Sequence, residues 1–112
     1  ESIGISADGK WVYGKTMQDT IVAYKTSREM QPPAWKMHAG FGYEHVPSML
    51  IEKGGSVFFG TKNGVVYSID PATQKINWAH KIDNSMVNTV RVINKSLLVV
   101  STMDGKVVLL KL

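Results

Sequence analysis

Histidine and carboxylate side chains gather in one short segment of this chain, where metal or acid-base chemistry would be sought first. His38, Glu44 and His45 lie within residues 37–47. A metal site needs three or four ligands that converge from ordered positions with support behind them. Glycines interrupt this segment, and the spacing matches no zinc signature. We therefore expect a polar connecting loop that holds no metal, with a metal site as the alternative.

Hydroxyl side chains recur at intervals of a little over forty residues, at Ser2, Ser48 and Thr89. No histidine and carboxylate pair stands at a defensible spacing from any of them for nucleophilic work. We expect these hydroxyls to close local backbone hydrogen bonds. The chain has no cysteine, which excludes a disulfide framework, a thiolate metal site and a cysteine nucleophile. The sequence therefore predicts no catalytic residue, no cofactor-binding residue and no metal ligand in residues 1–112.

A repeat of a little over forty residues must position these side chains. Residues 64–69 align with residues 19–24 and 105–110, at offsets of 45 and 41. An apolar run closed by a small residue precedes each of them, with turn residues between, so each pair is predicted to be a β-hairpin. The runs are 11–14, 57–60 and 97–101. A further strand is expected ahead of each hairpin, at 2–5, 48–51 and 89–92, and a strand carrying Trp35 or Trp78 follows two of the hairpins.

Four-stranded antiparallel units of this length, with no helical periodicity, are typical of propeller blades. We predict an all-β fold: an incomplete β-propeller of about two and three-quarter four-stranded antiparallel blades, forming a single segment over residues 1–112. The units are expected at about 1–46, 47–87 and 88–112, the last lacking its outer strand. Because a propeller usually has about four to eight blades, we interpret the chain as a fragment, from the C-terminal part of a longer chain.

In such a segment, the loop at 37–47 joins the outer strand of one blade to the inner strand of the next, on a face where propellers bind ligands and partners. The candidate binding face consists of Phe41, Tyr43, Glu44, His45, and, one unit later, Met86, Asn88 and Thr89. The alternative is that Phe41 and Tyr43 pack over the top of the blade.

Charge and hydropathy narrow the choice of partner. The net charge of +4 comes from single charges spread along the chain, which disfavours nucleic acid because phosphate recognition needs clustered cations. No apolar run is long enough to span a membrane. An incomplete ring leaves strand edges unpaired, so we expect copies to associate through the last unit, near residues 107–112.

Residues 64–78 resemble the quinoprotein-type propeller repeat. The matching residues include Tyr67, Asp70, Thr73, Lys75 and Trp78. Ser68 stands for the usual alanine and Gln74 for the usual glycine. The first unit matches at Ala23, the apolar strand and Trp35, and the last unit at its hairpin only. Apart from the resemblance, Asp70 before Pro71 predicts a type I turn, and Trp35 and Trp78 are predicted to pack between blades. Because Gln74 stands where the glycine of the repeat usually has a positive φ, we expect this turn to be either slightly strained or differently shaped.

The resemblance implies one of two functions. Some members are enzymes that bind pyrroloquinoline quinone with calcium, and others are cofactor-free scaffolds of the bacterial cell envelope. Because alcohol-oxidising members stack a disulfide on the quinone and this chain has no cysteine, we favour a non-catalytic scaffold that binds a protein or polymer in the periplasm or envelope. The alternative is a fragment of a quinone-dependent or other propeller enzyme whose active site lies in other blades. Tryptophan-aspartate repeat scaffolds are less favoured, since no Trp-Asp or Gly-His pair occurs.

Overall fold

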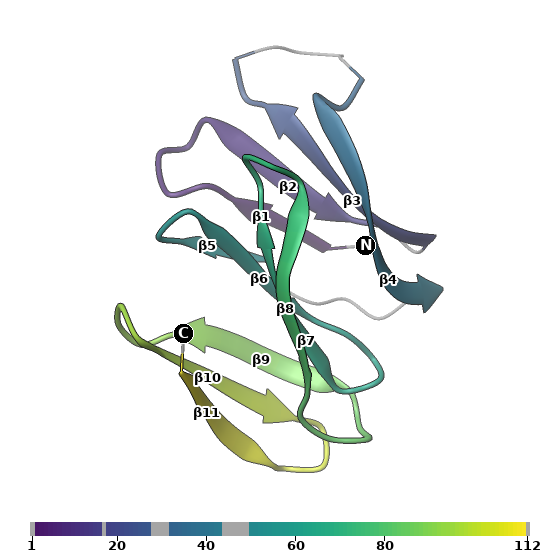
Figure 1. Ribbon diagram of the computed structural model, residues 1–112, viewed down its shortest axis with the longest axis vertical. Coiled ribbons are helices and arrows are strands. Elements are labelled where there is room, and N and C mark those ends of the chain that lie inside the picture. The colour runs from purple at the N-terminus through teal and green to yellow at the C-terminus, as the bar shows by residue number, and fades with distance from the viewer. Residues whose placement is uncertain (1, 17, 28–31, 44–49, 112) are drawn as a thin grey trace.

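A computed structural model describes residues 2–16, 18–27, 32–43 and 50–111, with the backbone alone at residues 2, 18 and 41–43. Strands follow one another with short turns, and no helix occurs in these ranges (Figure 1). The strands are β1 (Ser2–Ile5), β2 (Trp11–Lys15), β3 (Gln18–Lys25), β4 (Trp35–Tyr43), β5 (Ile51–Lys53), β6 (Ser56–Gly60), β7 (Val65–Asp70), β8 (Lys75–Lys81), β9 (Val87–Val92), β10 (Leu97–Thr102) and β11 (Val107–Lys111).

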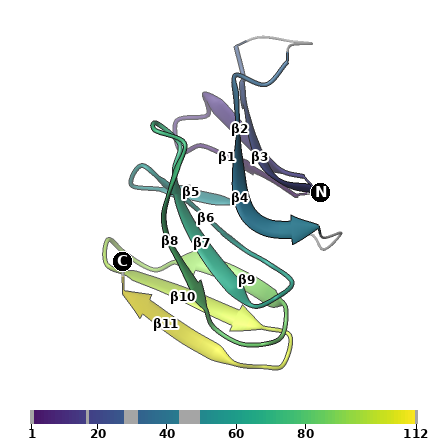
Figure 2. The ribbon, with the colours of Figure 1, turned by 45° about the vertical axis from the view of Figure 1, so that its right-hand side comes forward.

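The strands form three antiparallel sheets in chain order. The first sheet has the order β1-β2-β3-β4 and the second β5-β6-β7-β8, while the third contains three strands, β9, β10 and β11. Figure 2 shows the sheets stacked one after another, and the innermost strands β1, β5 and β9 contact in sequence. The all-β fold and the incomplete propeller are therefore confirmed. The described part of the chain has no helix that is long and apolar enough to cross a membrane.

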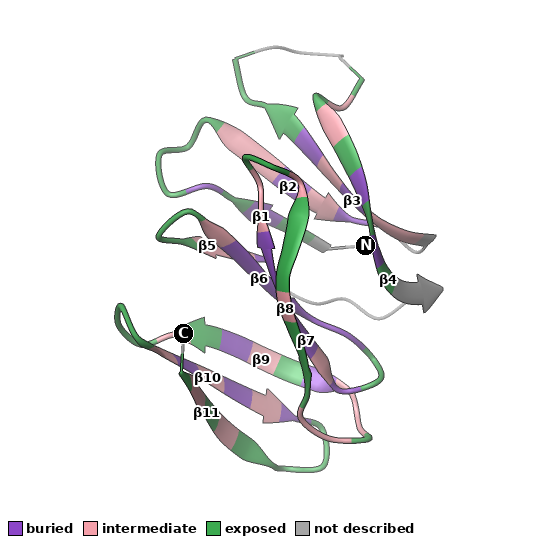
Figure 3. Cartoon of the chain, viewed as in Figure 1, coloured by how far each residue is buried: buried purple, intermediate pink, exposed green. Residues whose placement is uncertain are grey.

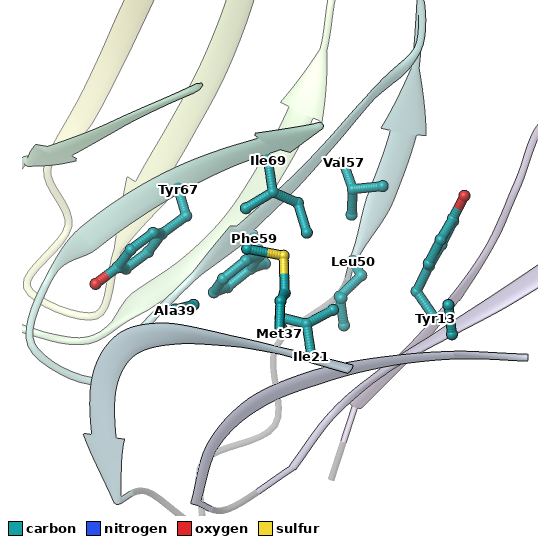
Figure 4. Packing of buried hydrophobic residues seen from close by; sticks show 10 residues of the cluster. Tyr13, Ile21, Met37, Ala39, Leu50, Val57, Phe59, Tyr67 and Ile69 are labelled. Carbon is teal, nitrogen blue, oxygen red and sulfur yellow. The ribbon is translucent and has the colours of Figure 1, made fainter. Parts of the chain in front are cut away.

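Two apolar clusters hold the sheets together. The first interface, between the first and second sheets, buries Ile21 and Met37 against Phe59, Val57 and Ile69 (Figure 4). The second interface, between the second and third sheets, buries Phe58 and Val66 against Val87, Val90, Leu98 and Val100. Alternate residues of β6 and β7 thus point to opposite neighbours, so these two central strands of the second sheet are buried on both faces (Figure 3).

The second and third central hairpins close with the same four-residue loop, at 61–64 and 102–105. Gly64 N–H donates to Thr61 C=O at 3.3 Å, and Gly105 N–H to Thr102 C=O at 3.0 Å. The last loop residue has a positive φ in all three hairpins: 68° at Asp19, 78° at Gly64 and 87° at Gly105. This is a tight turn followed by a left-handed residue, a form that matches the twist of the strands. A threonine begins all three loops, as Thr16, Thr61 and Thr102.

Two details of the sequence prediction are wrong. The apolar runs pair Gly14 with Gly60, but the strand register pairs Lys15↔Ile21 and Gly60↔Val66, so Lys15 is the equivalent of Gly60. The predicted alignment of the first run is shifted by one residue, because β2 continues past Gly14 to Lys15. The second inner strand is described from Ile51 to Lys53. Of the predicted range 48–51, Leu50 lies outside the strand and packs in the first interface, while residues 48 and 49 lie outside the described residues.

The turn between β7 and β8 also differs from its prediction. Gln74 N–H donates to Asp70 C=O at 2.8 Å, which closes a five-residue turn instead of a four-residue type I turn. The Asp70 carboxylate accepts from Ala72 N–H at 2.9 Å, and Gln74 has the expected positive φ, 55°. The Gln74 amide donates to the carbonyls of Pro71 and Ala72 at 2.7 and 3.0 Å, which compensates for the left-handed backbone.

Candidate binding face

The candidate binding face lies at the end of the sheets where β9 begins. Residues 82–86 cross from β8 to β9 and meet the loop of residues 102–105 between β10 and β11 (Figure 1). Met103 N–H donates to Met86 C=O at 2.9 Å, and Val87 N–H donates to Thr61 C=O at 3.0 Å. The connection is therefore fixed to the turns of both neighbouring sheets.

Asp83 organises this connection. Its carboxylate accepts from the Thr102 hydroxyl at 3.0 Å, from the Ser85 hydroxyl at 3.2 Å and from Asn84 N–H at 2.7 Å. Lys106 Nζ donates to the carbonyl of Ile82 at 3.0 Å. The Ser85 hydroxyl accepts from Asp104 N–H at 3.3 Å. Four side chains thus tie the crossing segment to the third sheet, so that the groups it carries are held on an ordered backbone.

The electrostatics agree with this role. The Asn84 N–H, followed by the Thr102 hydroxyl, the Ser85 hydroxyl and the Lys106 charge, holds the pKa of Asp83 below its ordinary value of 3.8, against a smaller opposing effect of burial. Asp83 is therefore a carboxylate at neutral pH. A group that is already saturated with donors at this position serves to hold the loop and is unsuited to general acid-base catalysis.

Three of the predicted residues can be placed with their side chains. Asn88 is exposed, while Met86 and Thr89 are half-buried where β9 starts. Sequence reasoning missed Met103, which is 58% exposed beside Met86, and Asp83. The threonine common to the three loops could have revealed this region, since it marks the same turn in every unit.

The other predicted residues lie in or beyond β4. The backbone of Phe41 and Tyr43 ends β4, with Tyr43 opposite Gln18, whereas Glu44 and His45 lie outside the described residues. His38 is exposed on the same strand. The described residues contain no cluster of three histidine, aspartate, glutamate or cysteine side chains that could hold a metal ion, and the proposed cluster with Glu44 and His45 stays untested.

One hydroxyl lies near an imidazole. Thr20 Oγ1 and His38 Nδ1 are 3.4 Å apart on the surface of the first sheet. Nucleophilic catalysis also requires a third group that orients the base. No carboxylate is hydrogen-bonded to His38 among the residues that the structure describes, so this pair offers weak hydrogen bonding and no catalytic arrangement.

The predicted structural residues occupy equivalent places in the first two sheets. Trp35 lies across from Ala23 and 6.1 Å from the Tyr13 ring, and Trp78 lies across from Ser68 and 6.1 Å from the Phe58 ring. Both indoles are half-buried against the interface that follows their sheet. Asp70, Pro71 and Thr73 lie in the turn at the opposite end of the second sheet.

Solved structures with the same arrangement are propellers. The computationally designed Ika8 protein matches with a TM-score of 0.79 and 14% identity over 98% of this chain and 32% of its own. Sqt1 of Saccharomyces cerevisiae matches with a TM-score of 0.75 and 15% identity, over 100% of this chain and 31% of its own. The WD40 repeats of RRP9 match with a TM-score of 0.77 and 11% identity, over 96% of this chain and 34% of their own. The chain thus spans about a third of these structures, and the likeness shows the fold alone. No family model and no curated protein matches the sequence.

Proposed function

We propose that this chain is a non-catalytic propeller segment that binds another protein or a polymer through the candidate binding face. One observation carries the proposal: exposed Asn88, at the start of β9, and exposed Met103, in the neighbouring loop, flank a connection that Asp83 and two turns hold in place. An ordered backbone carrying mixed apolar and amide groups suits partner binding, because little entropy is lost on docking.

Site-specific photo-crosslinking tests this proposal. A photoreactive residue at Asn63, Asn88 or Met103 should capture one partner from the native cell extract. The control positions are Asp8 and Ala72, which are exposed in turns of the first and second sheets at the end opposite the candidate binding face. Equal capture of that partner from both ends would disprove the assignment of the face.

The quinoprotein-type family remains a proposal that is supported by residues 64–78 and by the left-handed Gln74 in the position of the usual glycine. The same resemblance supports a periplasmic or cell-envelope location. Its alternative, a fragment of a quinone enzyme, predicts that the protein with all its blades would reduce a dye when it is supplied with pyrroloquinoline quinone and calcium. Fractionation of the source cells, followed by this assay on the complete protein, separates the scaffold from the enzyme.

Self-association through the third sheet is part of the same proposal. On β11, Val107 and Leu109 are 68% and 60% exposed, and in the described residues this strand pairs with β10 only. A strand edge with apolar neighbours recruits other strands. Light scattering should show a molecular mass that increases with protein concentration. The Leu109→Lys variant should have the mass of a monomer. A monomer at every concentration would refute association.

A further inference from the structure

A pocket of about 490 Å³ opens between the second and third sheets, at the end opposite the candidate binding face. Strands β6, β7 and β8 contribute Phe58, Ser68 and Trp78, which lie in one row across the second sheet. The turn between β9 and β10 contributes Asn94 and Lys95. The pocket therefore has a wall on one blade and a rim on the next.

The pocket exists because one position differs between the first two units. The strand register makes Trp11 the equivalent of Ser56. Trp11 packs against the first cluster, as Trp35 does, with Lys25 Nζ 5.7 Å from its ring. At the second interface Ser56 stands in place of this large indole, and Phe58 and Trp78 line the pocket. The volume that the tryptophan fills in the first interface is thus left empty in the second.

A β-bulge adds a polar base to the pocket. Ser68 pairs with Trp78 and Ile69 with Ile76, which leaves Asn77 as an extra residue in β8. The bulge brings the Asn77 amide to the hydroxyls of Ser68 and Ser56, to which it donates at 3.1 and 3.3 Å. Ser68 is 1% exposed, and its own hydrogen has no acceptor among the described residues.

The ammonium groups of Lys53 and Lys95 and the amide nitrogen of Asn94 supply donors at the rim of the pocket. Lys53 and Lys95 bring two positive charges to its rim, and none of the lining residues is acidic. The Asn94 side-chain oxygen accepts from Ser96 N–H at 2.8 Å, while its amide nitrogen donates to no other described residue. Donors and cations favour an anion with oxygen acceptors, and the tilted rings of Phe58 and Trp78 favour a flat apolar body.

We propose that this pocket binds a small aromatic carboxylate, with its ring against Phe58 and Trp78 and its carboxylate toward Lys53, Lys95 and Asn94. The pocket size suits a ligand of one or two rings. This site is separate from the candidate binding face, so it can be tested without knowledge of the protein partner.

Isothermal titration with 2-naphthoate as the probe tests the proposal. We expect saturable binding, and at least about tenfold weaker binding of 2-naphthylmethanol, which has the same rings without the charge. Ser56→Trp restores the indole of the first interface and should abolish the binding of 2-naphthoate. Absence of saturable heat, equal binding of the two compounds, or an unchanged titration of a folded Ser56→Trp variant would overturn the proposal.

A second pair of variants covers the case in which Ser56→Trp fails to fold. Lys53→Gln with Lys95→Gln should weaken 2-naphthoate at least about tenfold and leave the weak binding of the alcohol unchanged. Lys10→Gln with Lys111→Gln removes the same net charge outside the pocket and should leave both titrations unaltered. If the two double variants weaken 2-naphthoate equally, the attraction is a general charge effect, and the site is disproved.

Discussion

The first and second interfaces repeat one aromatic pair and differ beside it. The rings of Tyr13 and Trp35 are 6.1 Å apart and tilted by 44°, and those of Phe58 and Trp78 are 6.1 Å apart and tilted by 43°. The residue between the rings is Ala23 in the first sheet and Ser68 in the second. The strand register thus fixes the pair, while the smaller positions around it are free to change.

One equivalent position carries a side chain that crosses the first interface but carries no side chain at the second. Lys15 is 3% exposed, and its Nζ donates to the carbonyl of Gly60 at 3.1 Å, across the first interface. Gly60, its equivalent in the next unit, has no side chain, and Val87 of the third sheet packs against it. The same place is therefore a polar link in one interface and a close apolar approach in the other. The repeat defines the geometry of stacking, but each interface is filled in its own way.

Removing the shared indoles should have the largest effect. Trp78→Ala opens the second interface and should lower the free energy of unfolding by about 3 kcal/mol, through lost packing with Phe58 and its neighbours. Trp35→Ala is the matched variant at the first interface, with a similar expected loss. Thermal and denaturant melts measure both. Unchanged stability in Trp78→Ala would contradict its role between the blades.

The next largest effect tests the close approach in the second interface. In Gly60→Ala the new Cβ would lie 2.5 Å from Val87 Cβ, and still closer to Val87 Cγ1, so one sheet must move. We expect a loss of about 2 kcal/mol, as for other overpacked sites.

The control for this variant is a double-mutant cycle. Val87→Ala makes room, so the losses of Gly60→Ala and Val87→Ala should be less than additive. Denaturant melts of the two single variants and the double variant measure the coupling. Additive losses would mean that Gly60 acts through its own backbone and that the distinction between the interfaces is misplaced.

A smaller effect is expected for the polar link of the first interface. Lys15→Met keeps the apolar stem but leaves the Gly60 carbonyl without the ammonium donor, so we expect a loss of about 1 kcal/mol. The urea midpoint measures it, with Lys10→Met as the exposed control. A gain in stability would show that burying the charge outweighs the hydrogen bond, so that Lys15 opposes the packing of the first interface.

The sequence was sufficient for what depends on local pattern. Turn residues and alternating apolar positions predicted the hairpins. The repeat offset of 45 residues aligns Asp19 with Gly64, and both have a positive φ. For Gln74 the sequence left two outcomes open, a positive φ or a differently shaped turn, and both occur: its φ is 55°, and its N–H closes a five-residue turn on Asp70. These features depend on a few neighbouring residues, so one sequence contains their cause.

Features that depend on two sheets at once could not be predicted. The pocket beside Trp78 requires both the serine at position 56 and the bulge at Asn77, and neither is visible before the strands are paired. Asp83 was missed for the same reason, because Thr102, which donates to it, is distant in the sequence and belongs to the next sheet. The sequence therefore pointed to Met86 in this connection without the group that orders it, and the binding role of the face stays a prediction.

The smallest expected effect sharpens the comparison through pH. The pKa of Asp83 is lower in the folded chain than its ordinary value of 3.8, chiefly through the Asn84 N–H. Its contribution to stability is therefore fully present above about pH 4 and is lost as the pH falls through the lower folded value. Melting temperatures measured from pH 6 to about pH 2 should fall less steeply in Asp83→Asn than in the unchanged chain. Asp8→Asn is the control in the first sheet, because the Ser6 hydroxyl and Lys10 N–H lower the pKa of Asp8 without joining two sheets.

Hydrogen exchange at the third sheet gives the second measurement. If acid speeds the exchange in the Asp8→Asn variant but not in Asp83→Asn, the connection that orders the candidate binding face depends on the charge of Asp83. A response that is the same in both variants would show that the second interface is held by its apolar cluster alone.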